Sequence, residues 1–162
     1  MSEHRDTAGV IAPPPLLALA AAVLGLLIDR WLPFDALGAL LSWPARLAIG
    51  VLLFAACAAF GFPALFAFRA AGTHVEPWKP ATALVTTGIF RRLRNPMYVG
   101  IVLFLLGLAI LLASDGILAM TLLLMPVLHF GVVRREERYL EAKFGDAYRR
   151  YKETVPRYGW LR

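Results

Sequence analysis

The sequence has little charge and almost no cysteine for its length. Its 162 residues are 17% charged and 59% hydrophobic, whereas soluble domains average about 25% and about 45–50%. Together with a mean hydropathy of +0.65, this composition excludes an ordinary soluble enzyme and a disordered chain. The single cysteine, Cys57, cannot form an internal disulfide, and the three histidines lack the spacing of a zinc site. We therefore expect an integral membrane protein without a metal.

Four apolar segments predict transmembrane helices, because about 20 apolar residues cross the hydrocarbon core of a bilayer. Three of them contain no Asp, Glu, Lys or Arg, namely residues 47–68, 97–113 and 116–133. The weaker fourth candidate, residues 16–32, carries Asp29 and Arg30 near its end and also resembles a signal peptide. We favour a retained helix that begins at the three prolines 13–15. The triplet 114–116, Ser-Asp-Gly, predicts a tight turn between the last two spans.

Basic residues are concentrated on one side of this topology. Of the 17 Lys and Arg residues, five lie in residues 69–95 and nine follow Val133. Because basic residues stay on the cytoplasmic side, we expect both termini and the 69–95 loop to be cytoplasmic, in a bacterial inner membrane. Arg91, Arg92 and Arg94 are interpreted as anchors of this topology. No boundary within residues 1–162 is indicated, so we expect a single membrane domain.

The segment after Val133 predicts an amphipathic helix outside the hydrocarbon core, because its apolar residues recur at helical spacing. Gly145 is expected to mark a bend or a junction between two helices. Glu136 and Glu137 fall within about one helical turn of the predicted bilayer boundary, where an uncompensated charge is costly. One interpretation is that they pair locally with the neighbouring arginines, Arg134, Arg135 and Arg138.

The other interpretation places the two glutamates in a ligand site. Asn95, a candidate helix cap, and Tyr98 stand at the start of the third predicted span, at the same cytoplasmic end as Glu136 and Glu137. Carboxylates beside arginines suit a zwitterionic or cationic ligand, although they do not name it. His129, near the cytoplasmic end of the last span, is a further candidate for the wall of such a site.

Two blocks of the sequence resemble a known family. The first is Leu84-Val-Thr-Thr-Gly-Ile-Phe-Arg-Arg-Leu-Arg-Asn-Pro-Met-Tyr-Val-Gly100; the second contains Glu136-Glu137, Phe144-Gly145, Tyr148, Tyr151 and Val155-Pro156, with a hydrophobic hairpin between them. The pattern is similar to the isoprenylcysteine carboxyl methyltransferase and phospholipid methyltransferase superfamily. The resemblance covers residues 72–158, which we interpret as a methyltransferase core, and leaves residues 1–68 as variable N-terminal spans.

The resemblance implies an all-α integral membrane fold with about four transmembrane helices. In that fold the cytoplasmic loop and the amphipathic C-terminal helix form a site for S-adenosylmethionine without a Rossmann sheet, and the sequence has no Gly-rich nucleotide fingerprint after a strand. The cofactor contacts it implies are Thr82, Leu84, Val85, Phe90, Asn95, Pro96, Met97, Tyr98, Glu136 and Glu137.

The sequence departs from the family pattern at three positions. Asn95 stands where the family usually has histidine, and Phe90 where it often has tyrosine. The arginine that meets the substrate carboxylate in the isoprenylcysteine branch corresponds to Val132 here. We therefore assign the substrate contact to Arg134 or Arg135.

The implied reaction transfers a methyl group to a lipophilic acceptor, either the carboxylate of an isoprenoid or the amine of a lipid. A carboxylate is already ionised at neutral pH, whereas an amine must first lose a proton, for which Glu137 and Tyr98 are candidate bases. The alternative is a non-enzymatic membrane protein whose basic C-terminal helix binds anionic lipid or a protein partner. A transporter is disfavoured because only Asp29 and Arg30 bring charge into a span. No nucleic-acid partner is expected, because the basic residues flank membrane segments.

Overall fold

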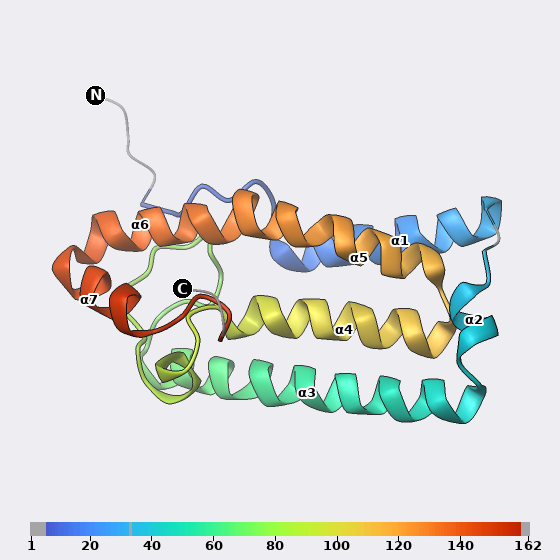
Figure 1. The fold of residues 1–162 in the computed structure, drawn as a ribbon. Helices are drawn as coiled ribbons and strands as arrows, with labels where there is room; N and C mark the ends of the chain where they lie inside the picture. Colours follow the sequence, from blue (N-terminus) through green and yellow to red (C-terminus); the bar gives the residue numbers. More distant parts are fainter. Residues whose placement is uncertain (1–5, 33, 160–162) are drawn as a thin grey trace.

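The computed structural model describes residues 6–32 and 34–159, and within these ranges it contains helices and no strands. Figure 1 shows α1, α3, α4 and α5 lying side by side as a bundle. The elements are α1 (Pro14–Trp31), α2 (Ala36–Leu40), α3 (Trp43–Ala70), the 3-10 helix η1 (Gly88–Arg91), α4 (Pro96–Leu112), α5 (Asp115–Leu128), the π-helical η2 (His129–Val133), α6 (Arg134–Phe144) and α7 (Asp146–Thr154). The all-α class is confirmed.

The predicted spans correspond to these helices. Pro14–Trp31, Trp43–Ala70 and Asp115–Phe144 are long and apolar enough to cross a membrane, and Pro96–Leu112 is a shorter apolar helix. The helix Asp115–Phe144 includes α5, η2 and α6, and its 30 residues reach about 45 Å at 1.5 Å per residue. A hydrocarbon core is only about 30 Å thick, so α6 extends beyond it. The amphipathic helix expected after Val133 is therefore the continuation of the last span, and it ends at Gly145 (φ +54°), the predicted junction.

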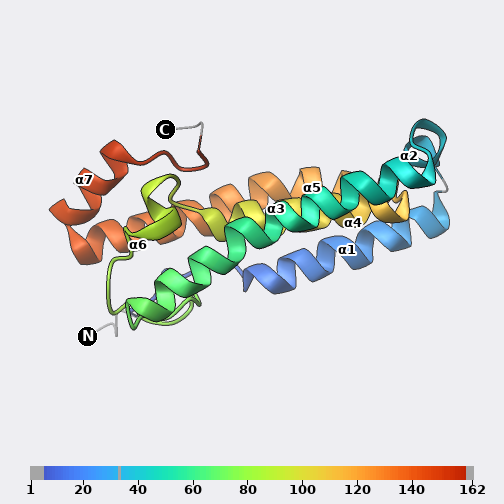
Figure 2. The same ribbon diagram turned by 90° about the horizontal axis from the view of Figure 1, so that it is seen from below.

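Glycines set the closest helix contacts in the bundle. A Cβ on Gly25 of α1 would lie 2.5 Å from the Cα of Ile117, and one on Gly116 of α5 would lie 2.2 Å from the carbonyl oxygen of Gly25. Gly107 of α4 similarly admits the ring of Phe54 from α3, which lies obliquely across α4 in Figure 2. The backbones of α1 and α5 can approach this closely only because neither glycine carries a side chain.

Two carboxylates tie together the end of the bundle that carries α2. Asp29 of α1 accepts hydrogen bonds from the Gly116 amide (2.7 Å) and the Ser114 hydroxyl (2.5 Å). Asp115 accepts from the amides of Ala36 (2.6 Å) and Leu37, at the start of α2. Each carboxylate therefore satisfies amide groups that a helix N-terminus leaves without an intrahelical partner.

The predicted turn between the last two spans is shifted. The left-handed residue is Ala113 (φ +52°), and Ser114 caps α5 by accepting from the Ile117 amide. Gly116 lies inside α5 and is required by the contact with α1, not by the turn. The expectation of a Ser-Asp-Gly turn was therefore wrong in detail, because the close packing of two helices is not visible in a local triplet.

The opposite end of the bundle carries α6, α7, the 71–95 loop, and the first and last described residues (Figure 1). The N-terminal segment, residues 6–13, runs along α6. Within it, the Ile11 amide donates to the Gly131 carbonyl (3.2 Å), and Arg135 donates to the Gly9 carbonyl (2.8 Å). The clustering of the loop and both ends of the described chain agrees with the topology that the basic residues predict. The side of the membrane that this end faces stays a prediction.

Candidate functional site

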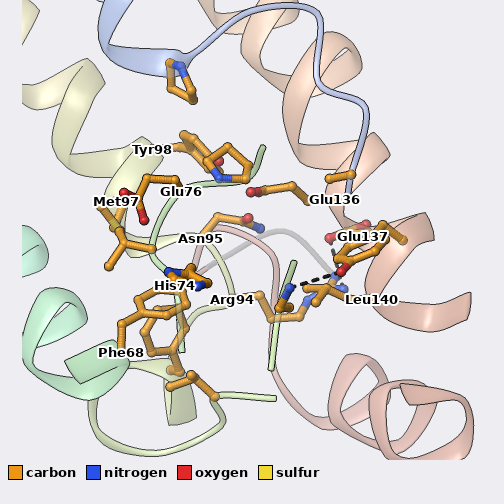
Figure 3. A pocket seen from close by; sticks show the side chains of 18 of the residues that line it. Phe68, His74, Glu76, Arg94, Asn95, Met97, Tyr98, Glu136, Glu137 and Leu140 are labelled. Carbon is orange, nitrogen blue, oxygen red and sulfur yellow. Dashed lines mark hydrogen bonds and ion pairs between the residues drawn. The ribbon is translucent and has the colours of Figure 1, made fainter. Parts of the chain in front are cut away.

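A cavity of about 220 Å³ lies at this end of the bundle. Its walls come from the start of α4, the 74–85 segment of the loop, α6, α7 and the N-terminal segment (Figure 3). Apolar side chains such as Leu84, Phe90 and Met97 form much of the lining, and polar side chains converge at its α6 side. A mostly apolar cavity with a few convergent polar groups is typical of a small-molecule site.

The start of α4 places a short block of side chains along this cavity. Pro96 occupies the first helical turn, where its missing amide removes no helical hydrogen bond. Asn95 occupies the cap position, but its side chain does not cap the helix; its Nδ2 instead donates to the Arg157 carbonyl at 3.2 Å. The interpretation of Asn95 as a capping side chain was wrong, because its side chain is turned to the C-terminal segment and its oxygen accepts from no amide of the first turn.

Glu137 is held by two arginines from distant parts of the chain. Arg94 Nη1 lies 3.0 Å from Glu137 Oε1, and Arg157 donates to both carboxylate oxygens at 2.8 and 2.7 Å. Glu137 is buried, and the Arg94 side chain is only 3% exposed. Local pairing of Glu137 with Arg134, Arg135 or Arg138 is therefore wrong. Arg94, interpreted from the sequence as an anchor of the topology, is buried in this ion pair and so has a structural role that the sequence did not reveal.

Glu136 has a different environment, although it is the next residue. Its carboxyl group points across the cavity towards Tyr98, which projects from the first turn of α4 (Figure 3). No ion pair joins Glu136 to a Lys or Arg among residues 6–32 and 34–159. Two adjacent glutamates therefore serve separate purposes: Glu137 holds the C-terminal segment in place, and Glu136 presents an unpaired carboxyl group to the cavity.

Three tyrosines near the cavity remain protonated at neutral pH. Burial raises the pKa of the Tyr148 hydroxyl, and the charge of Glu137 raises it further. Burial likewise raises the pKa of Tyr151, whose hydroxyl donates to the Phe90 carbonyl at 2.7 Å, and raises the pKa of Tyr158 to about 12. These protonated hydroxyl groups can donate or accept hydrogen bonds, but they do not act as bases at neutral pH.

Tyr139 of α6 joins the two segments that cover the cavity. Its hydroxyl accepts from the Ala81 amide of the loop at 3.0 Å and bonds to Asp6 Oδ1 of the N-terminal segment at 2.9 Å. Hydrogen bonds from Lys143, and then from Tyr139, lower the pKa of Asp6. Because its pKa is lowered, the Asp6 side chain stays ionised and holds the N-terminal segment at every pH above the ordinary pKa of an aspartate. The contact is lost only as the pH falls through the lowered pKa.

The loop itself is closed by a threonine. The Thr73 hydroxyl accepts from the amides of Thr82 (2.9 Å) and Ala83 (3.3 Å), and Thr82 Oγ1 donates to the Gly72 carbonyl. This double bridge holds the 73–83 stretch as a compact turn. Leu84 and Val85, which follow this turn directly, lie against the cavity.

The structure brings most of the predicted cofactor positions together. Nine of them line the cavity, namely Leu84, Val85, Phe90, Asn95, Pro96, Met97, Tyr98, Glu136 and Glu137. Thr82 is exposed outside it and takes part in the bridge to Thr73.

The predicted substrate arginines lie outside the cavity. Arg134 stacks on Phe130 with its guanidinium 5.7 Å from the ring centroid, and Arg135 holds the N-terminal segment. His129 does not line the cavity either, and its Nδ1 is 3.0 Å from the Tyr158 hydroxyl.

Several residues of the site were missed from the sequence. Arg94 and Tyr148 line the cavity, Arg157 fixes Glu137, and Tyr139 joins the covering segments. Arg94 is adjacent to Asn95 in the first block of the resemblance, so its position in that block was the available signal. Nothing in the local sequence marks Arg157, because its partner is 20 positions away.

Comparison with known proteins decides the family. A profile of the phospholipid methyltransferase family matches residues 45–147. The chain belongs to this family. The matched region includes α3, the loop, α4, α5 and α6, which together supply most of the cavity wall.

Individual proteins similar to this chain match a shorter part of it than the family profile does. The protein-S-isoprenylcysteine O-methyltransferase of Schizosaccharomyces pombe is 42% identical over 76 residues, which is 45% of this chain and 31% of that protein. The chain therefore spans less than a third of the length of that relative. An uncharacterized protein of Haemophilus influenzae is 40% identical over 65 residues, which is 40% of this chain and 100% of that protein. No solved structure matches the chain.

Proposed function

We propose that the chain is an S-adenosylmethionine-dependent methyltransferase that acts on a lipophilic acceptor from the membrane. The observation that carries this proposal is the cavity at the membrane boundary, whose lining includes the buried Arg94 and the carboxyl group of Glu136, which forms no ion pair within the described residues. Membership of the phospholipid methyltransferase family and the similarity to an isoprenylcysteine O-methyltransferase support it.

The charged groups of the cavity fit the ends of this cofactor. Arg94 Nε is buried and has no hydrogen-bond partner within the described ranges, although its Nη1 lies beside Glu137. A buried donor without a partner is costly, so an anionic ligand group such as the carboxylate of the methionine moiety would satisfy it. Glu136 suits the cationic groups of the same molecule or its ribose hydroxyls.

The apolar part of the cavity fits the rest of the cofactor. Leu84, Val85, Phe90 and Met97 offer surfaces on which an adenine ring can pack. When bound, S-adenosylmethionine supplies an electrophilic methyl group. The residues of the chain contribute by orienting the reactants and by excluding water, which dominates the rate of a direct displacement.

The acceptor is proposed to enter from the bilayer between α1 and α4. Pro14 and Pro15 of α1 and Tyr98 and Ile101 of α4 line the cavity at this seam, and all of them offer apolar contact area. The carboxylate of a prenylated acceptor needs no base to remove a proton. This agrees with the raised pKa values of Tyr148, Tyr151 and Tyr158, which keep these hydroxyl groups protonated. An amine acceptor requires a base, and Glu136 is the candidate because Glu137 is already paired with two arginines. With the predicted topology, the cavity opens to the cytoplasm, where the cofactor is available.

Calorimetric titration tests the cofactor assignment. Detergent-purified protein is titrated with S-adenosylmethionine and S-adenosylhomocysteine, and the Glu136→Gln variant is expected to lose at least about tenfold in affinity, the order of a lost charge-assisted contact. The matched control is Glu141→Gln, the same change on the same helix, where the carboxylate pairs with Lys152 outside the cavity. Thr82→Ala should bind as the parent does, because Thr82 lies outside the cavity.

Absence of saturable binding by the parent protein, with lipids added back, would contradict the proposed function. That result would favour the non-enzymatic alternative, in which the basic C-terminal helices bind anionic lipid. Equal affinity of Glu136→Gln and the parent would contradict the role of Glu136. If binding is found, transfer of a radiolabelled methyl group to a prenylated cysteine or to phosphatidylethanolamine distinguishes O-methylation from N-methylation.

A further inference from the structure

A second depression lies on the outside of the same end of the molecule, between η1 and α7. It is lined by two arginines, two threonine side chains and the back of Tyr151, namely Thr86, Arg91, Arg150, Tyr151 and Thr154, together with Ala147 and Val155. Its lining contains no acidic side chain. We propose that this depression binds the phosphate group of an anionic phospholipid.

The charges of the depression are not used within the protein. Arg91 and Arg150 are exposed, and neither forms an ion pair with any residue that the structure describes. By contrast, two other basic residues of α7 are paired: Arg149 with Asp146 of the same helix, and Lys152 with Glu141 of α6. Two guanidinium groups from separate elements therefore face one hollow without a counter-ion, and guanidinium groups bind phosphate through paired hydrogen bonds.

The position of η1 places this hollow at the bilayer surface. A Cβ on Gly88 of η1 would be 3.9 Å from the Cβ of Ala67, in the last turns of α3. In the same part of α3, Phe62 and Phe66 are exposed, and they are 60% and 64% accessible in the isolated chain. Phe66 directly precedes Ala67, and Phe62 lies about one turn before Phe66. Acyl chains that cover these rings would bring their headgroup to the level of Arg91. A membrane lipid therefore fits the hollow better than a soluble phosphate does.

Binding at the depression would also reach the cavity. Tyr151 lines both hollows, and its hydroxyl donates to the carbonyl of Phe90, whose ring lines the cavity. A phosphate held by Arg91 and Arg150 bridges η1 to α7 in parallel with this hydrogen bond. The lipid would therefore hold in place the turn that supplies Phe90 to the cavity wall.

Native mass spectrometry tests the site directly. Purified protein is mixed with phosphatidylglycerol or with phosphatidylcholine of the same acyl chains. We expect the protein to retain one molecule of phosphatidylglycerol and to retain phosphatidylcholine less. Arg91→Gln and Arg150→Gln should each lower its affinity about fivefold, the size expected for one basic residue facing an anionic lipid. Arg92→Gln is the matched control, because Arg92 is exposed next to Arg91 but does not line the depression.

Three results would overturn the proposal. Equal retention of the two lipids would indicate an apolar belt without headgroup recognition, and an equal loss in Arg92→Gln would indicate a diffuse basic surface. Displacement of the lipid by millimolar glycerol phosphate or inorganic phosphate would indicate a site for a soluble anion. The two arginines lie on different elements, so either variant tests the site if the other fails to fold. No methyl donor enters the measurement, so its outcome is independent of the proposed methyltransferase function.

Discussion

The two ends of the bundle treat their carboxylates differently. At the end that carries α2, Asp29 and Asp115 accept hydrogen bonds from donors at helix N-termini. At the opposite end, Glu136 faces the cavity, and its carboxyl group forms no ion pair within the described residues. Both ends therefore place carboxylates near a membrane boundary, where an uncompensated charge is costly. At the first end the cost is offset within the protein by amide and hydroxyl donors. At the second end no cation of the described chain compensates the Glu136 carboxyl group. A carboxyl group left in this way can bind a cationic or hydroxyl-bearing ligand.

The ends also differ in how their helices meet. Gly25 and Gly116 bring the backbones of α1 and α5 into contact at the α2 end, so little space remains there. At the other end the helices are separated by the loop, by the N-terminal segment and by large side chains such as Tyr98 and Tyr148, which leave the cavity between them. Substitutions at the α2 end should therefore change stability without changing binding, and substitutions in the cavity can change binding without changing stability.

The largest effect on stability is expected from Glu137→Ala. This change leaves the buried Arg94 and the partly exposed Arg157 without their shared carboxylate, and breaking a buried ion pair from one side costs about 3–5 kcal/mol. Thermal unfolding in detergent measures the loss. Glu141→Gln, which removes the partner of Lys152 at the surface, should leave the melting temperature unchanged. A similar melting temperature for Glu137→Ala and the parent would contradict the structural role given to Glu137.

A smaller loss is expected from Gly25→Ala at the α2 end. The new Cβ would lie 2.5 Å from backbone atoms of Ile117, which cannot rotate away as a side chain would, and overpacking costs about 1–3 kcal/mol. Gly61→Ala is the matched control, because nothing lies within 4 Å of a Cβ there. That control should melt at the same temperature as the parent or slightly higher, since alanine favours a helix over glycine by about 0.5–1 kcal/mol. Equal behaviour of the two variants would rule out the close contact between α1 and α5.

Asp29→Ala is expected to cost about 0.5–2 kcal/mol, the usual value of a lost helix cap. The change removes the acceptor of the Gly116 amide and the Ser114 hydroxyl while leaving the cavity untouched. Asp29→Asn should lose less, because its side-chain carbonyl can still accept one of these bonds. Calorimetry on Asp29→Ala should give the cofactor affinity of the parent; a weaker affinity would mean that the two ends are energetically coupled.

The smallest effect on stability is expected from Glu136→Gln. The substitution breaks no ion pair, because Glu136 pairs with no cation within the described residues, and a neutral carboxamide costs less to bury than an ionised carboxylate. The melting temperature should therefore be unchanged or raised, even though cofactor affinity falls. A variant that melts well below the parent would show instead that Glu136 is a structural residue like Glu137.

Features that depend on a few adjacent residues were predictable from the sequence. The four apolar segments became α1, α3, α4 and the α5–α6 helix, and Gly145 became the junction before α7. The two blocks of the resemblance also identified nine residues that converge on one cavity. A hydrophobic run or a proline at a helix start acts through local sterics and solvation, so its consequence can be derived without knowledge of the fold.

Features that depend on distant partners were not predictable. Three arginines lie within three residues of Glu137 in its own helix, yet Glu137 pairs with Arg94 and Arg157. Asn95 likewise stays at the N-cap position of α4, but its side chain donates to a carbonyl of the C-terminal segment instead of capping the helix. In each case the partner is decided by how the helices and the C-terminal segment pack, and a single sequence carries no direct record of that packing.

The π-helical stretch η2 sets the direction in which both glutamates point. A residue advances about 100° around the axis of an α-helix, and a π-bulge inserts one residue into the turn. The wide turn absorbs this extra residue, so the side chains of α6 keep the phase that they would have on a regular helix one residue shorter. If the same residues His129–Val133 formed a regular α-helix instead, α6 would be rotated by about 100° relative to α5, and Glu136 and Glu137 would leave the cavity with their identities and their neighbours in the sequence unchanged. Deleting one residue from this stretch would remove the bulge and leave both glutamates facing the cavity, whereas inserting one residue into the regular part of α5 would turn both of them away from it.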